Sequence, residues 1–159
     1  LVRQAKDQGA IICADTKMPS FRQLTLADVR EALPYIDYIF PNENEAAYYT
    51  GRDSYPDMAA ALLEMGVGHV VIKTGPAGCL CRSREDCFTL PAFPVKALDS
   101  TGAGDNFAAG FISALLHGED FYQCCRFGTA AAAVCVTATG STAAVKDREQ
   151  ILAFLAMQQ

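Results

Sequence analysis

The segment from Asp99 to Phe111, DSTGAGDNFAAGF, places small residues and an acidic residue at the start of an apolar, helix-like run. Gly102 and Gly104 let the backbone approach a ligand closely. The first N–H groups of a helix have no partner within the helix and lie at the positive end of its dipole, so they bind anions. A carboxylate at Asp105 could accept the proton of a hydroxyl that attacks a phosphate held there. This arrangement suits phosphoryl transfer.

The same residues have a purely structural interpretation, which their types alone leave open. Aspartate is a common residue at a helix N-terminus, so Asp105 would cap the helix and the glycines would form a tight turn. Two familiar nucleotide-binding motifs are excluded. The chain contains no G-x-x-x-x-G-K-[ST] sequence, and Phe107 stands where a dinucleotide fingerprint needs its third small residue.

Two further segments carry candidate ligand-binding residues. Asn42 and Glu45, in PNENE, are three residues apart, on one face of a first helical turn. There an amide and a carboxylate could hold a hydrated magnesium ion and a phosphate, or they could form a capping box. Thr74, Gly75 and Gly78, in KTGPAG, follow an apolar strand-like run. These residues lie at the carboxyl end of the expected strand, where α/β sheets bind ligands. Many loops without a function have the same composition.

The elements that must position these segments alternate between strand and helix. Strands are expected over 10–15, 37–40 and 69–75, and an antiparallel hairpin over 78–81 and 87–90. Helices are expected over 24–36, 43–51, 55–66, 104–118, 120–140 and 147–159, after an opening helix that ends near Gly9. Pro34 should bend or end the helix over 24–36. This order predicts an α/β fold whose sheet is covered by helices on both faces.

Composition narrows the class of partner. The 159 residues are 51% hydrophobic, enough for one domain with a core, and the formal net charge of -5 is scattered along the chain. No basic block predicts nucleic-acid or membrane binding, so a small-molecule ligand is expected. Seven cysteines, mostly in apolar segments, indicate reduced thiols in a cytoplasmic protein. Lys17 and Arg22 lie in the loop after the first strand. They are expected either to contact a substrate or to be exposed to solvent without a functional role.

The ordered occurrence of PNENEA, KTGPAG and DSTGAGDNFAAGF resembles the PfkB carbohydrate kinase family, the ribokinase-like sugar and nucleoside kinases. The resemblance implies a three-layer α/β/α fold with a mainly parallel sheet, and ATP-dependent phosphorylation of a hydroxyl on a small sugar. It implies that Asp105 is the catalytic base and that the backbone N–H groups of Gly102, Ala103 and Gly104 form the anion hole. A nucleoside acceptor is the alternative within the family.

Further positions follow from the same resemblance. Asn42 and Glu45 would position magnesium and the triphosphate of ATP, with Glu45 acting through water, and Thr74, Gly75 and Gly78 would touch the phosphates. The helix that contains Thr129 and Ala132, with the loop to Gly140, would flank adenine. The monovalent cation site that many members place beside the anion hole matches a set of four positions: Asp99, Thr101, Cys135 and Gly140.

The chain departs from the family in length. The resemblance implies that residues 1–159 form the carboxyl-terminal part of a single kinase domain, with the nucleotide site and the base. The amino-terminal part, which supplies most sugar contacts and a β-sheet lid, is absent from this sequence. A non-catalytic nucleotide-binding module therefore remains an alternative, and so does a homo-oligomer that covers the exposed edge of the sheet.

Overall fold

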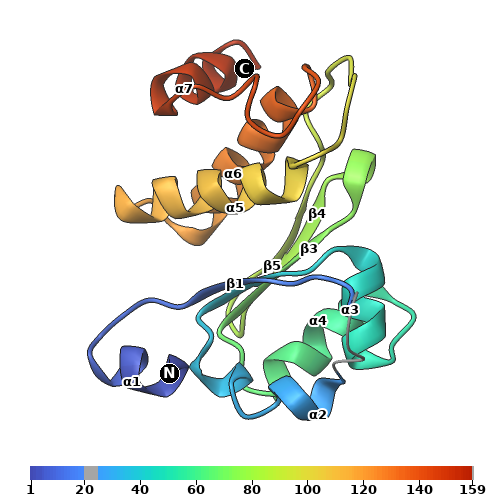
Figure 1. Cartoon of the computed structure of the whole chain (residues 1–159), viewed down its shortest axis with the longest axis vertical. Coiled ribbons are helices and arrows are strands. Elements are labelled where there is room, and N and C mark those ends of the chain that lie inside the picture. Colours follow the sequence, from blue (N-terminus) through green and yellow to red (C-terminus); the bar gives the residue numbers. More distant parts are fainter. Residues whose placement is uncertain (20–24, 159) are drawn as a thin grey trace. The chain divides into compact units, whose positions relative to one another are not determined.

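The computed structural model describes residues 1–19 and 25–158. Two compact units are present: the first comprises Leu1–Thr74 and Leu80–Thr89, and the second comprises Gly75–Cys79 and Leu90–Gln159. Figure 1 labels their helices and strands. Asn42, Glu45 and Thr74 fall in the first unit, and Gly75, Gly78 and the DSTGAGDNF segment fall in the second.

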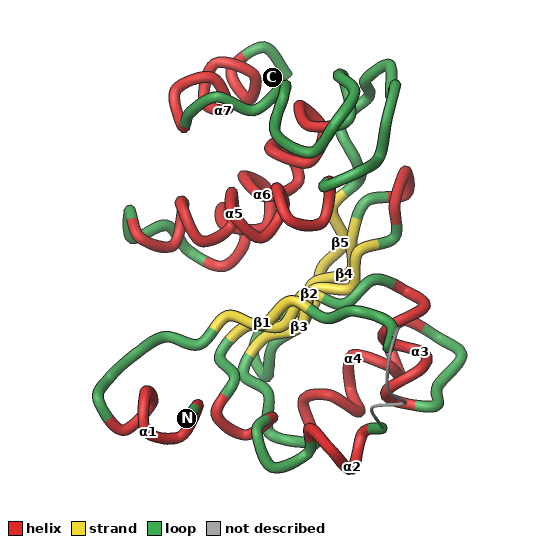
Figure 2. Tube along the Cα trace, viewed as in Figure 1, coloured by secondary structure: helices red, strands yellow, loops and turns green. Residues whose placement is uncertain are grey.

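One sheet contains five strands in the order β1-β2-β3-β4-β5, shown in yellow in Figure 2. They are β1 (Cys13–Asp15), β2 (Tyr38–Phe40), β3 (His69–Lys73), β4 (Cys79–Arg82) and β5 (Cys87–Leu90). The pairs β1–β2 and β2–β3 are parallel. The connections before and after β4 are too short for a parallel crossover, so β4 and β5 complete the sheet as a meander. The expected α/β fold with a mainly parallel sheet is confirmed.

The first unit contains α1 (Val2–Asp7), α2 (Leu26–Val29), the 3₁₀ turn η1 (Leu33–Tyr35), α3 (Glu43–Thr50) and α4 (Tyr55–Glu64). Of these, η1, α3 and α4 contribute buried residues to the core around the central strands. The core includes Val70 and Ile72 of β3 and Leu62 of α4, each at most 2% exposed. Ser54 caps α4 and Gly51 ends α3 in the left-handed conformation, as their residue types predict.

Several expected elements are shorter than the sequence suggests: β3 ends at Lys73 rather than residue 75, and α6 ends at Cys135 rather than residue 140. The helix expected over 24–36, with a bend or end at Pro34, is interrupted earlier: α2 ends at Val29, and η1 follows after a break. Residue 24 lies outside the described residues. Pro34 has no N–H to donate and disfavours helical geometry before it, which explains the break. The first strand begins at Cys13 rather than residue 10, because the Ile12 N–H donates to the Asp37 carboxylate (2.8 Å) instead of to a neighbouring strand.

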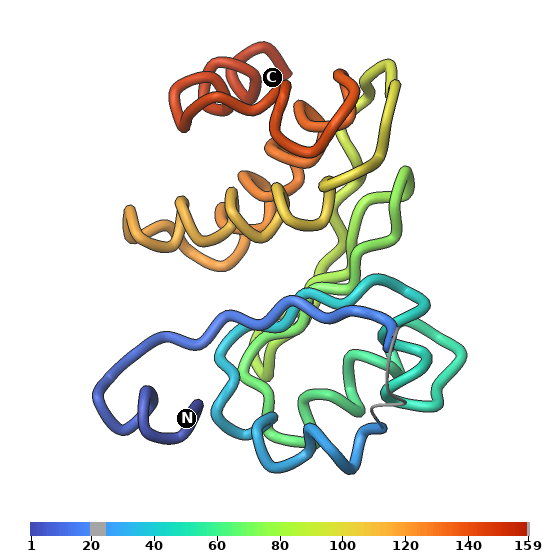
Figure 3. Tube along the Cα trace, viewed as in Figure 1, coloured from blue at the N-terminus to red at the C-terminus, as the bar shows by residue number. Residues whose placement is uncertain are grey.

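The second unit is built on a closely packed helix pair. It contains the turn η2 (Gly75–Ala77), α5 (Ala103–Leu116), α6 (Phe121–Cys135) and α7 (Arg148–Ala156). Figure 3 shows α5 and α6 as the yellow-to-orange hairpin of the trace. The helices meet at small residues: a Cβ added to Gly110 would lie 2.7 Å from Cβ of Ala131 and 3.2 Å from Cα of Gly128. Their backbones therefore approach at the limit that these side chains allow.

A valine at Gly110 is expected to destabilise the chain by about 1 to 3 kcal/mol, because the new side chain has no room against α6. Ala109→Val provides the matched control. It also introduces a β-branched side chain into α5, but at an exposed position. The free energy of unfolding in urea measures both. Equal losses for the two variants would contradict the close approach.

In the part of the chain that the structure describes, no helix combines the length and apolar character needed to cross a bilayer. The seven cysteines are not in disulfides; Cys87 is exposed, Cys13 is half-buried and the other five are buried.

Candidate active site

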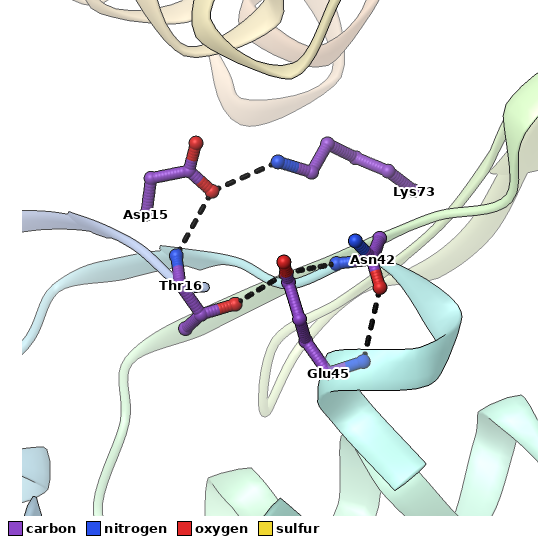
Figure 4. A network of polar contacts seen from close by, with 5 residues as sticks. All are labelled: Asp15, Thr16, Asn42, Glu45 and Lys73. Carbon is purple, nitrogen blue, oxygen red and sulfur yellow. Dashed lines mark hydrogen bonds and ion pairs between the residues drawn. The ribbon is translucent and has the colours of Figure 1, made fainter. Parts of the chain in front are cut away.

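Asn42 and Glu45 form a reciprocal capping box at the start of α3 (Figure 4). Asn42 Oδ1 accepts a hydrogen bond from the Glu45 N–H (2.9 Å), and Glu45 Oε2 accepts one from the Asn42 N–H (2.8 Å). The structural interpretation of this pair is therefore correct. It leaves the ligand interpretation open, because a capping box uses only part of each side chain.

The Glu45 carboxylate is held from a second side by the end of β1 (Figure 4). Thr16 Oγ1 donates to Glu45 Oε2 at 2.7 Å. Asp15 Oδ1 in turn accepts the Thr16 N–H (3.0 Å) and the ammonium of Lys73 (2.8 Å). Asp15 ends β1 and Lys73 ends β3, so the network spans the carboxyl edge of the parallel strands, where α/β sheets bind ligands.

Thr16, Asp15 and Lys73 were not identified from the sequence as site residues. A signal for them exists, since each lies where an expected strand ends. The strand order, which brings these ends together, is a tertiary property. The candidate Lys17 is exposed and its backbone carbonyl accepts a hydrogen bond from Tyr49 (3.2 Å). Arg22 lies outside the described residues.

The chemistry of this network fits magnesium held through water. Glu45 is only 6% exposed, and its Oε2 already accepts two hydrogen bonds. Among the described residues nothing donates to Oε1, so this oxygen keeps its capacity to accept a hydrogen bond from metal-bound water. Magnesium prefers oxygen ligands and retains several waters, a requirement that one fixed carboxylate oxygen meets.

The KTGPAG segment forms the end of β3 and the turn η2. Gly75 has a φ of +59° and Gly78 a φ of +101°, and the Gly78 N–H donates to the Gly75 carbonyl (3.0 Å). A Cβ at Gly78 would lie 1.9 Å from the Leu90 carbonyl oxygen. The turn itself therefore explains both glycines, and Thr74, which is half-buried, is the side chain left for a ligand.

Gly102, not Asp105, occupies the N-cap position of α5. Gly102 has a φ of +78°, the helix begins at Ala103, and no side chain caps it. Asp105 is the third helical residue and is exposed. The interpretation of Asp105 as a helix cap was wrong, and its carboxylate lies in the first turn without a capping bond.

The three amides expected to form an anion hole are not equivalent. The Ala103 N–H donates to the Ser100 carbonyl at 3.2 Å, which closes the turn before the helix. Within residues 1–19 and 25–158, the N–H groups of Gly102 and Gly104 have no acceptor. These two donors, at the positive end of a helix of 14 residues, are the pair left for an anion.

Asn106 links the loop before α5 to the segment after α6 by hydrogen bonds. Its Nδ2 atom lies 2.9 Å from the Gly102 carbonyl oxygen, 2.8 Å from that of Ser141 and 3.2 Å from Cys135 Sγ. The chain segments are so close that a Cβ at Gly102 would lie 2.4 Å from Cβ of Ser141. Neither Asn106 nor Ser141 was recognised from the sequence, although an asparagine one turn after a glycine can bond back to its carbonyl.

Asp99 is also hydrogen-bonded to the segment after α6. Its Oδ1 accepts the Thr101 N–H and its Oδ2 accepts the Gly140 N–H, both at 2.9 Å. These backbone hydrogen bonds, with that of Gly140 the stronger influence, lower the pKa of the Asp99 carboxyl. The structure thus brings together Asp99, Thr101, Cys135 and Gly140, the four positions expected around a monovalent cation.

Cys135 lies among backbone carbonyls at the end of α6. Its Sγ is 3.6 Å from the Thr101 oxygen and 3.7 Å from the Ser141 oxygen. Burial, and then the negative charges of Asp99 and Asp105, raises the pKa of this thiol. Carbonyl oxygens are hard ligands that suit K⁺, so the chemistry of the donor set fits such an ion.

The expected adenine-flanking residues differ in exposure. Thr129 is 7% exposed, and its hydroxyl donates to the Cys125 carbonyl within α6 (2.8 Å). Ala132 is half-buried. Thr129 thus uses its hydroxyl inside the helix, and Ala132 is the more accessible of the two.

Comparison with known proteins identifies the family of this chain. The model of the pfkB family of carbohydrate kinases matches residues 1–148. A ribokinase of Haemophilus influenzae is 37% identical over 130 residues, which are 79% of this chain and 42% of the relative. A nucleoside kinase of Methanothermobacter thermautotrophicus is 32% identical over 143 residues, 90% of this chain and 45% of the relative.

Among solved structures, Arabidopsis thaliana ribokinase complexed with ribose and ATP superposes with a TM-score of 0.84 at 28% identity. The match covers 97% of this chain and 50% of that one. The chain thus has a ribokinase-like α/β fold and spans about half the length of the proteins it matches. With the family model covering nearly all of its residues, the chain belongs to the PfkB family of carbohydrate kinases.

Proposed function

We propose that this chain is the nucleotide-binding and base-carrying part of an ATP-dependent kinase that phosphorylates a hydroxyl on a small sugar. The observation that carries the proposal is the first turn of α5. There the exposed Asp105 carboxylate follows directly on the uncommitted N–H groups of Gly102 and Gly104. Ribokinase relatives and a ribokinase solved with ribose and ATP support the choice of sugar and nucleotide.

In the proposed reaction Asp105 accepts the proton of the acceptor hydroxyl as its oxygen attacks the γ-phosphorus of ATP. The bond between that phosphorus and the β,γ-bridging oxygen breaks, and ADP leaves. The Gly102 and Gly104 amides stabilise the charge on the transferred group, with Ala103 supporting the turn. Phosphoryl transfer depends on positioning and charge stabilisation more than on covalent help, so a fixed base and fixed donors suffice.

The candidate nucleotide contacts divide by role. Asn42, Glu45, Thr74, Gly75 and Gly78 are proposed to bind the phosphates, and Thr129, Ala132 and Gly140 to flank adenine. Magnesium, when bound, would neutralise phosphate charge, and Glu45 would hold it through water. A monovalent cation such as K⁺ would be held near Asp99, Thr101, Cys135 and Gly140.

An assay of ADP release with a panel of pentoses, hexoses and nucleosides tests the proposal. It requires the protein in its full natural length, because the relatives are about twice as long as the matched region. ATP-dependent phosphorylation of a sugar, confirmed by mass spectrometry of the product, is the expected result. ATP binding with no ADP release in the presence of any acceptor would replace the kinase by a non-catalytic nucleotide-binding module.

A nucleoside is the second candidate acceptor. The nucleoside kinase relative shares 32% identity over 90% of this chain, so the nucleotide-binding part does not separate the two acceptor classes. Phosphorylation of a nucleoside with no turnover of free sugars would favour this alternative and would leave the roles of Asp105 and Glu45 unchanged.

A further inference from the structure

Thr16 is the one side chain in the described structure whose hydroxyl touches the Glu45 carboxylate. The contact joins residues 29 positions apart, at 2.7 Å, and Glu45 Oε2 is its acceptor. The same oxygen accepts the Asn42 N–H at 2.8 Å. Two donors from different elements therefore fix one oxygen of the carboxylate and leave Oε1 as the other.

Thr16 is itself held in place (Figure 4). Its N–H donates to Asp15 Oδ1 (3.0 Å), and this oxygen also accepts the Lys73 ammonium (2.8 Å). Lys73 is mostly shielded, with 16% of its side chain exposed. The backbone of Thr16 is thereby tied to the ends of β1 and β3, which places its side chain beside Glu45.

A capping box alone does not require this third donor. The reciprocal Asn42–Glu45 bonds already satisfy the helix N-terminus. The Thr16 bond adds a constraint on the direction of the carboxylate, and direction matters for an ion held at Oε1 rather than for the cap. Partners of this kind, which orient a metal-binding carboxylate without touching the metal, commonly tune metal affinity.

We infer that Thr16 is a positioning residue, whose hydroxyl orients the Glu45 carboxylate toward magnesium bound with ATP. The inference rests on the proposed function of Glu45. It adds a residue to the site, and it predicts that a change at Thr16 alters the dependence of nucleotide binding on magnesium more than nucleotide binding itself.

The test is calorimetry of ATP binding to the full-length protein, with Mg²⁺ and with EDTA. The measured quantity is the ratio of the two dissociation constants, EDTA over Mg²⁺. Thr16→Val replaces the hydroxyl by a methyl group of similar size, and it is expected to lower this ratio about tenfold. Thr16→Ser retains the hydroxyl and is expected to keep the ratio of the unchanged chain.

The outcomes separate the inference from the function on which it rests. If the unchanged chain binds ATP more tightly with Mg²⁺ and Thr16→Val keeps the full ratio, the inference is overturned and the function of Glu45 stands. A loss in Thr16→Ser equal to that in Thr16→Val also overturns it, because the hydroxyl would not be the cause. No Mg²⁺ effect in the unchanged chain would overturn both. Circular dichroism checks folding, and Thr16→Ala replaces the valine variant if that variant unfolds.

Discussion

Replacing Asp105 by asparagine is expected to lower turnover by about 10²- to 10⁴-fold, the usual contribution of a general base. The amide keeps the size of the side chain and cannot accept the proton of the acceptor hydroxyl. ATP affinity should change little, because the Gly102 and Gly104 amides remain. Steady-state kinetics of the full-length kinase, with calorimetry of ATP binding, measures both quantities.

The position of Asp105 makes this result easy to separate from a loss of stability. The carboxylate makes no capping bond, so the variant loses only its interaction with the helix dipole, less than about 1 kcal/mol. Asp147→Asn is the matched control: Asp147 caps α7, and asparagine caps helices equally well. Both variants remove one negative charge. An equal fall in turnover in both variants would contradict the role of Asp105 as the base. So would an Asp105→Asn variant with unchanged turnover.

Gly102→Ala is the second change with a large expected effect. Alanine at a φ of +78° costs about 1 to 2 kcal/mol in strain, and its Cβ would lie 2.4 Å from Cβ of Ser141. The chain can relieve the overlap only by moving the start of α5 or the Ser141 segment. Either movement displaces the two amides proposed for the transferred phosphoryl group. Loss of one such donor lowers turnover by about 10²- to 10³-fold, and we expect a loss at least this large.

Gly118→Ala controls for the backbone strain. Gly118 follows α5 at its other end, has a φ of +77°, and no atom lies within 4 Å of an added Cβ. Its alanine variant should unfold more easily, by about 1 to 2 kcal/mol, and turn over normally. Thermal unfolding and turnover are measured for both glycine variants. An active Gly102→Ala enzyme would show that the contact with Ser141 does not position the anion hole.

Most elements of the fold could be predicted from local signals. Asn42 and Gly51 bound α3, and Pro56 stands in the first turn of α4, because capping and backbone preferences act within a few residues. The helix expected over 24–36 was predicted less well. Pro34 indicates a bend or an end, but the structure places the break earlier, after Val29.

The candidate site was predictable where its residues are neighbours in the chain. The segment 99–105 and the pair Asn42 and Glu45 carry their chemistry in short motifs. The contacts of Thr16 with Glu45 and of Asn106 with Ser141 join residues 29 and 35 positions apart. Such contacts depend on the strand order and on the path of the chain after α6, which a single sequence does not specify.

The two backbone hydrogen bonds to Asp99 help to identify the ionising groups behind a pH–rate profile of the proposed kinase. Because they lower the folded pKa of this carboxyl, its contribution to stability is complete above the unfolded value of about 3.9. That contribution is lost only as the pH falls through the lower folded value. The attachment of Gly140 to the anion-hole loop is therefore constant at neutral pH. An acid limb of kcat/KM between about pH 5 and 7 would report the ionisation of another group.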